Sequence, residues 1–106
     1  MTFDECVREY KRERIGPMLW KMTLEVTSRV ARSGYPPKSY GESKWDSRAV
    51  EELAQDVAIE RLIGEKQIDY VMEQATDLDS LSRLLAFQAK RALSRRRAVT
   101  VVDKLL

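Results

Sequence analysis

The 106-residue chain is 43% hydrophobic and 34% charged, so it is long enough for one folded domain and too apolar to be disordered. A single cysteine excludes an intrachain disulfide. The absence of histidine removes the commonest general base and metal ligand, and we therefore expect no enzyme, metal or cofactor. The net charge of +2 conceals a segregation: residues 1–41 carry +3, residues 42–79 carry −7 and residues 80–106 carry +6. An acidic and a basic face can serve different partners, or the two can attract each other within the fold.

Two helices are predicted at the beginning of the chain. The first begins with a capping box at Thr2 and Glu5 and runs to about Arg14, and Gly16-Pro17 breaks it. The second begins at Pro17 and ends before Gly34. In the first helix one face carries Phe3, Val7, Tyr10 and Arg14, and Cys6 beside them is expected to be buried. In the second helix, residues at helical spacing predict a buried stripe, made of Leu19, Met22, Val26 and Val30.

Residues 33–45 are predicted to form a loop, because Gly34 and Pro36-Pro37 interrupt the helical pattern. This loop carries three aromatic residues, Tyr35, Tyr40 and Trp45. We expect them to pin the loop onto the bundle. The alternative is that they grip a partner or a base.

A third helix is predicted over about 47–63, and it buries Val50, Leu53, Ala54 and Val57. Its opposite face carries Glu52, Gln55, Asp56, Ile59 and Ile63. An outward Ile pair flanked by acids is typical of a partner-binding face, although both Ile residues would also suit packing on a neighbouring helix. Carboxylates at this spacing are ordinarily solvated and do not predict a Mg²⁺ site. A fourth helix over 66–75 follows, with a stripe made of Ile68, Val71, Met72 and Ala75.

The fifth helix is the strongest functional signal. It is predicted to run from Asp77 to Arg97, capped by Thr76 with Asp79 in the capping-box position. One side carries the apolar stripe Leu78, Leu81, Leu85, Ala89 and Ala92, within about 80° on a helical wheel. The opposite side carries an aromatic residue among cations: Arg83, Phe87, Lys90 and Arg91, extended by Arg95, Arg96 and Arg97. We expect residues 98–106 to be a linker or a docking segment.

Residues 49–62 read Ala-Val-Glu-Glu-Leu-Ala-Gln-Asp-Val-Ala-Ile-Glu-Arg-Leu. This stretch resembles the region-two helix of bacterial RNA polymerase sigma factors of the extracytoplasmic-function type, which commonly reads Asp-Ala-Glu-Asp-Leu-Val-Gln-Glu-Val-Phe-Leu-Arg-Leu. The basic fifth helix then resembles the promoter-contacting helix of the same region. The resemblance covers roughly residues 18–97.

This resemblance implies an all-α bundle of about five helices that acts in transcription initiation. It implies binding of core RNA polymerase through Glu52, Gln55, Asp56 and Ile59. It implies promoter DNA binding through Arg83, Phe87, Lys90, Arg91, Arg95, Arg96 and Arg97. An anti-sigma-like regulator or a second copy of the chain are further expected partners.

The chain also departs from the sigma pattern. Its fifth helix reads Leu84-Leu-Ala-Phe-Gln-Ala-Lys-Arg91 where sigma factors usually carry a Trp and an Ala-Arg-Asn run, and the preceding loop is acidic and lacks aromatics. The resemblance therefore supports polymerase binding better than promoter-specific recognition. The alternative function is a helical protein-interaction module, with a homodimer as one form, that binds no nucleic acid. No apolar run reaches the length of a membrane span and the N-terminus has no export signal, so we expect a cytoplasmic protein.

Overall fold

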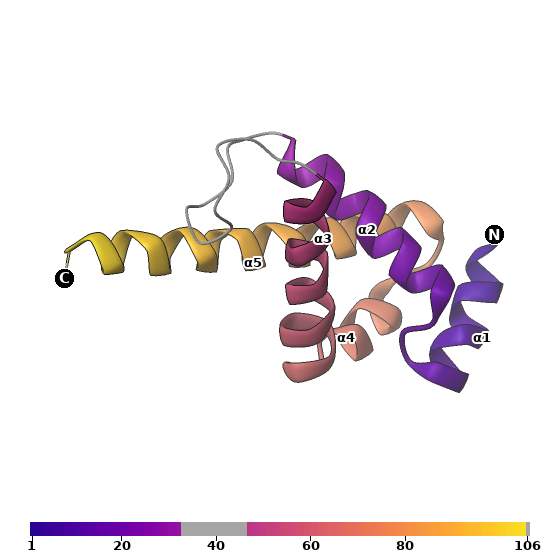
Figure 1. The fold of residues 1–106 in the computed structure, drawn as a ribbon. Helices are drawn as coiled ribbons and strands as arrows, with labels where there is room; N and C mark the ends of the chain where they lie inside the picture. Colours follow the sequence, from indigo (N-terminus) through magenta and orange to yellow (C-terminus); the bar gives the residue numbers. More distant parts are fainter. Residues whose placement is uncertain (33–46, 106) are drawn as a thin grey trace.

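The computed structural model describes the backbone of residues 1–32 and 47–105 and the side chains of residues 1–32 and 47–95. Within these ranges the chain is an all-α bundle without strands, which confirms the predicted fold class (Figure 1). Its elements are α1 (Phe3–Glu13), α2 (Pro17–Ala31), α3 (Ser47–Asp56), the π-helix η2 (Val57–Gly64), α4 (Gln67–Gln74) and α5 (Leu78–Leu105). In the described part of the chain, no helix combines the length and the apolar character that crossing a membrane requires.

The predicted capping box of α1 is confirmed. The Glu5 backbone N–H donates to Thr2 Oγ1 at 3.2 Å, and the Thr2 backbone N–H donates to Glu5 Oε1 at 3.2 Å. The helix ends at Arg14, which has a positive φ of 63°. This agrees with the predicted end at about Arg14, and Gly16 then serves as the N-cap of α2.

A buried carboxylate joins α1 to α2. Glu9 is only 1% exposed, and it accepts the backbone N–H groups of Gly16 at 3.0 Å, Met18 at 2.9 Å and Leu19 at 2.8 Å. These donors lie at the N-terminus of α2, where backbone N–H groups have no partner within the helix and the helix dipole favours negative charge. Gly16 itself has no side-chain cap, so Glu9 supplies the cap from the preceding helix.

The predicted third helix is one continuous rod made of α3 and η2, because Asp56 at the junction keeps helical angles of φ −60° and ψ −44°. The second half is wound more widely than an α-helix, with the Glu65 N–H donating to the Glu60 carbonyl five residues back at 3.0 Å. The rod ends at Gly64, in agreement with the predicted end at about residue 63. The reversal falls on Lys66, whose φ of 58° places it in the left-handed region.

Helix α5 begins and ends differently from the prediction. Asp77 rather than Thr76 is its cap: the Ser80 N–H donates to Asp77 Oδ1 at 2.7 Å, and Ser80 Oγ accepts the Asp77 N–H at 3.1 Å. This exchange holds the pKa of the Asp77 carboxyl below its usual range. The backbone remains helical to Leu105, beyond Arg97, and the last turns project past the other helices (Figure 1).

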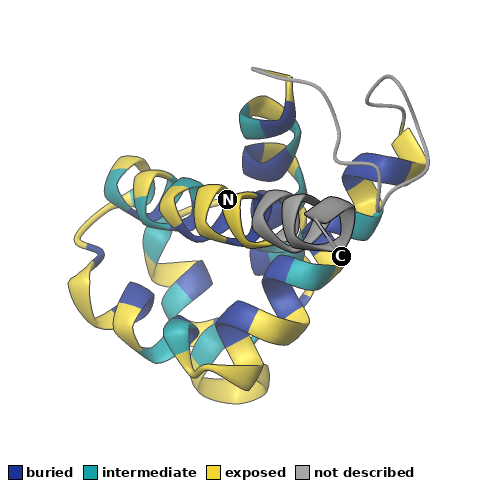
Figure 2. Ribbon diagram, turned by 90° about the vertical axis from the view of Figure 1, so that its left-hand side faces the viewer, coloured by how far each residue is buried: buried dark blue, intermediate teal, exposed yellow. Residues whose placement is uncertain are grey.

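The core predictions for α3, η2 and α5 are confirmed. In Figure 2 the buried residues of the helices face the interior of the bundle and the exposed ones lie on its outside. Leu78, at the start of the predicted α5 stripe, is half-buried. Cys6 is fully buried, as predicted, and burial raises the pKa of its thiol. The predicted core positions that are buried in α3, η2 and α5 are Val50, Leu53, Ala54, Val57, Leu81, Leu85, Ala89 and Ala92.

Candidate nucleic-acid and protein interfaces

The outer face of α5 carries the predicted aromatic residue among cations. Phe87 is 52% exposed, so it is available to a partner, and the Arg91 guanidinium carbon lies 5.8 Å from the centre of its ring. That distance allows a cation–π contact, which orients Arg91 along the aromatic side chain. The remaining cations of this face with described side chains are also exposed, namely Arg83, Lys90 and Arg95. The side chains of Arg96 and Arg97, and the aromatic residues of the predicted 33–45 loop, lie outside the described residues.

One edge of this face borders α2. Arg83 and Lys90 line a groove of about 430 Å³ together with Arg29 of α2. Valine and alanine side chains form the apolar part of the lining, and Ser82 and Asp79 complete it. Arg83 is paired with Asp79 at 3.3 Å, one helical turn earlier, and both side chains are largely exposed. The groove therefore collects more positive than negative charge.

The other edge borders η2. Arg95 Nη1 donates to Glu65 Oε1 at 2.6 Å, and this bond holds the pKa of Glu65 below its usual range and raises the pKa of Arg95. After Arg83, which pairs with Asp79, Arg95 is thus a second cation of the basic helix that is matched with the acidic 42–79 segment of the same chain. Arg95 is therefore less available to a partner than the sequence predicted.

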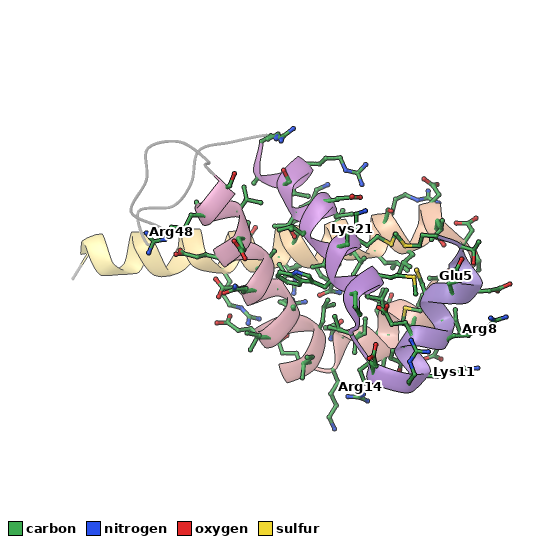
Figure 3. All side chains as sticks on the ribbon, turned by 45° about the vertical axis from the view of Figure 1, so that its right-hand side comes forward. Glu5, Arg8, Lys11, Arg14, Lys21 and Arg48 are labelled. Carbon is green, nitrogen blue, oxygen red and sulfur yellow. The ribbon has the colours of Figure 1, made fainter. Side chains whose placement is uncertain are left out.

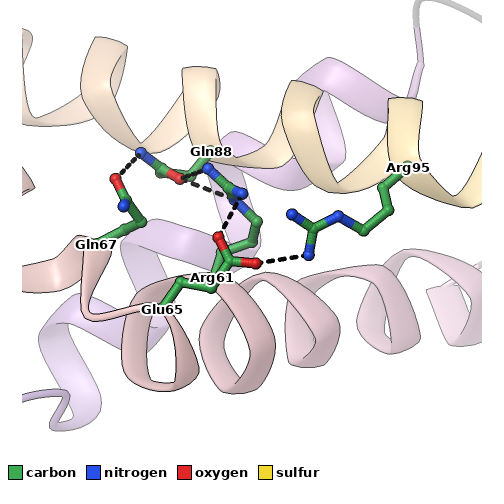
Figure 4. A network of polar contacts seen from close by, with 5 residues as sticks. All are labelled: Arg61, Glu65, Gln67, Gln88 and Arg95. Atoms are coloured by element: carbon green, nitrogen blue, oxygen red, sulfur yellow. Dashed lines mark hydrogen bonds and ion pairs between the residues drawn. The ribbon is translucent and has the colours of Figure 1, made fainter.

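Glu65, which is itself exposed, also belongs to a polar network between η2 and α5 whose central members, Arg61 and Gln88, are buried (Figure 4). Arg61 is 5% exposed and donates from Nη1 to Glu65 at 2.7 Å, and from Nε and Nη2 to Gln88 Oε1 at 3.0 and 2.8 Å. Gln88, 1% exposed, donates in turn to Gln67 Oε1 at 3.3 Å. The Nε, Nη1 and Nη2 atoms of Arg61 thus each donate to an oxygen, and these hydrogen bonds offset the cost of burying the guanidinium charge.

The predicted polymerase-binding face of α3 and η2 lies on the outside of the rod. Ile59 is 64% and Ile63 48% exposed, so neither is covered by a neighbouring helix in the described chain. Gln55 is exposed beside them, while Glu52 and Asp56 are half-buried. Glu52 pairs with Arg48 at 3.5 Å on the same face. The structure thus brings the predicted residues together on one surface that combines apolar and acidic groups.

The charged face of α1 points away from the bundle, with Arg8 and Lys11 directed outward (Figure 3). Its inner side is tied to α4. The Tyr10 hydroxyl donates to Asp69, which raises the pKa of the Tyr10 phenol, and Arg14 pairs with the same carboxylate at 3.2 Å. These contacts hold two helices together and assign α1 a supporting role rather than a site.

Two groups of residues at or beneath these surfaces were not predicted from the sequence. Arg61 and Gln88 are residue types that usually lie at the surface, and they are buried here because they pair with each other across facing helices. Arg29 of α2 joins the basic face of α5 only through the fold. No family model, curated protein or solved structure matched the chain in the comparisons made with known proteins.

Proposed function

We propose that the chain is a sigma-factor-like transcription-initiation domain that binds core RNA polymerase through α3–η2 and promoter DNA through α5. The observation that carries the proposal is the exposure of two chemically distinct faces on adjoining helices. Ile59 stands exposed among acidic and amide side chains on one helix. Phe87 stands exposed among cations on the other. The resemblance at residues 49–62 assigns the first face to polymerase.

The α3–η2 face has the composition of a protein-binding surface. An exposed aliphatic side chain provides apolar area that association removes from water, and surrounding carboxylates favour a basic partner and disfavour nucleic acid. Gln55 adds neutral hydrogen-bonding groups to this face. A basic helical surface of polymerase is the partner that this chemistry and the sigma resemblance together favour.

The α5 face has the composition of a surface for single-stranded DNA. Cations neutralise phosphates, and an exposed aromatic ring offers a platform on which an unpaired base can stack. Duplex DNA keeps its bases stacked on one another, so the aromatic ring is useful only where the strands are separated. The proposed DNA is therefore a melted promoter strand, bound with little dependence on base identity.

Binding of a fluorescent single-stranded oligonucleotide by the full chain tests this half of the proposal. Phe87→Ala should weaken binding by about 1–3 kcal/mol through lost stacking, with a smaller effect on duplex DNA of the same sequence. Lys90→Ala and Arg91→Ala should each reduce the dependence of log affinity on log salt by about 0.7. Equal losses on single strands and on duplex would argue against stacking, and unchanged binding in all three variants would refute the assignment of α5.

A protein-interaction module is the second candidate function. It is favoured by one observation: Ile59 and Ile63 are large apolar side chains that remain exposed on η2. In this case the apolar face would contact a second copy of the chain. The molar mass of the purified chain in solution distinguishes the two functions, because a stable dimer that loses its association in Ile59→Arg would support the module.

A further inference from the structure

The groove between α2 and α5 has no assigned role, and we propose that it binds the sugar–phosphate backbone of single-stranded DNA beside the base that stacks on Phe87. The inference rests on the proposed function and extends the DNA path from α5 onto α2. It adds a residue, Arg29, that lies outside the helix on which the resemblance places the DNA contacts.

Three cations line the groove, Arg29 from α2 and Arg83 and Lys90 from α5, against one carboxylate, Asp79. Neither Arg29 nor Lys90 is engaged by an acidic side chain within the described residues. The Arg83–Asp79 pair has side chains that are 74% and 81% exposed, and such a pair contributes little and exchanges readily for another anion. An incoming phosphate therefore meets a net positive groove without first breaking a buried ion pair.

The position of the groove connects it with the aromatic platform. Ala86, which lines the groove, directly precedes Phe87, and Lys90 lies one helical turn further along α5. A strand with a base on Phe87 would therefore have its adjacent backbone within the reach of these cations. Val26, Val30 and Ala86 give the groove an apolar surface that suits the carbon atoms of deoxyribose.

Shape and rigidity also favour a backbone ligand. The cations come from two helices that pack against each other, so their separation is fixed by the core rather than by a flexible loop. A volume of about 430 Å³ lies in the range of sites that hold a small ligand or a short segment of a longer one. An acidic peptide also carries negative charge, but it has no planar base to use the exposed ring and the cation at Phe87 and Arg91.

Replacing Arg29 tests the groove directly, because Arg29 is not among the DNA-contacting residues of the proposed function. Arg29→Ala should weaken binding of a fluorescent mixed-sequence DNA single strand severalfold at low salt. It should also reduce the slope of log affinity against log salt by about 0.7, the value for loss of one phosphate contact on a single strand. Arg29→Glu should weaken binding further, because it repels phosphate. Arg8→Ala is the matched control, since Arg8 is an exposed arginine on α1 that lies outside the groove lining. It should leave affinity and slope unchanged.

The possible results distinguish a failure of the groove assignment from a failure of the proposed function. If Arg29→Ala behaves like Arg8→Ala while Phe87→Ala still weakens binding, the groove assignment is wrong and the DNA-binding role of α5 stands. If the parent chain binds no single strand, both assignments are wrong. Competition by poly-glutamate at equal charge concentration would overturn the DNA assignment in favour of an acidic protein. A reduced slope of log affinity against log salt in Arg29→Ala, together with no competition by poly-glutamate, establishes the groove as a DNA backbone site.

Discussion

Phe87 and Gln88 are neighbours on α5, and each lies in surroundings opposite to those that its residue type usually prefers. The apolar Phe87 is 52% exposed, and the polar Gln88 is 1% exposed. Gln88 is tolerated inside because its carbonyl oxygen accepts two hydrogen bonds from Arg61. Phe87 is left outside because the stripe of α5 is already filled by residues on the opposite side of the helix. An apolar residue kept at the surface among cations is consistent with a role in binding.

Leu85 provides the direct test of how α5 is oriented. It is 1% exposed in the centre of the α5 stripe, so Leu85→Ala should lower the free energy of unfolding by about 2–5 kcal/mol in a denaturant titration. Phe87→Ala, two residues away on the exposed face, should change it by about 0.5 kcal/mol or less. A loss at Phe87 that equals the loss at Leu85 would mean that the helix presents a different face to the core.

The residues that could be predicted from the sequence are those governed by periodicity. Leu53, Val57 and Leu81 are apolar, recur at helical spacing and are fully buried as expected. Glu9, Arg61 and Gln88 could not be predicted, because each is buried only through partners supplied by another helix. Local patterns contain no information about such contacts, since the partners are separated by 10 and 27 residues in the chain.

At the level of elements, the start of α5 depends on a charged cap. Asp77 accepts the Ser80 N–H, and this bond keeps the pKa of its carboxyl lowered in the folded state. A group whose folded pKa is lowered stabilises the fold above its unfolded pKa, and that contribution is lost as the pH falls through the folded pKa. The capping contribution of Asp77 should therefore be present at neutral pH and disappear in acid.

The variant Asp77→Asn tests this dependence, because Asn retains an oxygen that can accept the same N–H but carries no charge. Its thermal midpoint should be below that of the parent at neutral pH, and the two should converge as the pH falls through the lowered pKa of Asp77. Asp4→Asn, an exposed acid in the first turn of α1 with no resolved cap bond, is the control for general charge effects. A difference between parent and Asp77→Asn that stays constant with pH would contradict the charged-cap account.

The contact between η2 and α5 depends on the Arg61–Gln88 pair. Gln88→Leu leaves a buried guanidinium short of an acceptor, and Arg61→Met leaves the Gln88 carbonyl without its donors, so each should cost about 1–3 kcal/mol. The double variant should cost less than the sum of the two by about 1 kcal/mol or more, because it removes both partners together. Additive losses in chemical unfolding would show that the two side chains contribute independently.

The boundaries of the elements were less predictable than their existence. The sequence predicts that the fifth helix ends at Arg97, whereas the backbone of α5 remains helical to Leu105. The third helix ends at Gly64, as predicted, but the π-type winding of its second half, η2, was not predicted.

In the whole molecule, the acidic and the basic segments of the sequence contribute to different faces. The acidic and apolar face lies on α3–η2, and the exposed cations Arg83, Lys90 and Arg91 lie on α5. The two segments attract each other through the Arg95–Glu65 and Arg83–Asp79 pairs, but Arg83, Lys90 and Arg91, the other α5 cations with described side chains, remain exposed. Internal pairing therefore accounts for only part of the segregation, and the remainder is available to two different partners.

The most direct measurement is the affinity of bacterial core RNA polymerase for the full chain and its surface variants. Ile59→Arg and Asp56→Arg change the α3–η2 face, and both should reduce the affinity by tenfold or more, on the order of the 1.4 kcal/mol or greater expected at the centre of an interface. Tyr70→Arg is the matched control, because Tyr70 is 49% exposed on α4, outside the predicted face. It should bind polymerase as the parent does. Binding that is absent in the parent, or equally strong in Ile59→Arg and Tyr70→Arg, would contradict a sigma-like role.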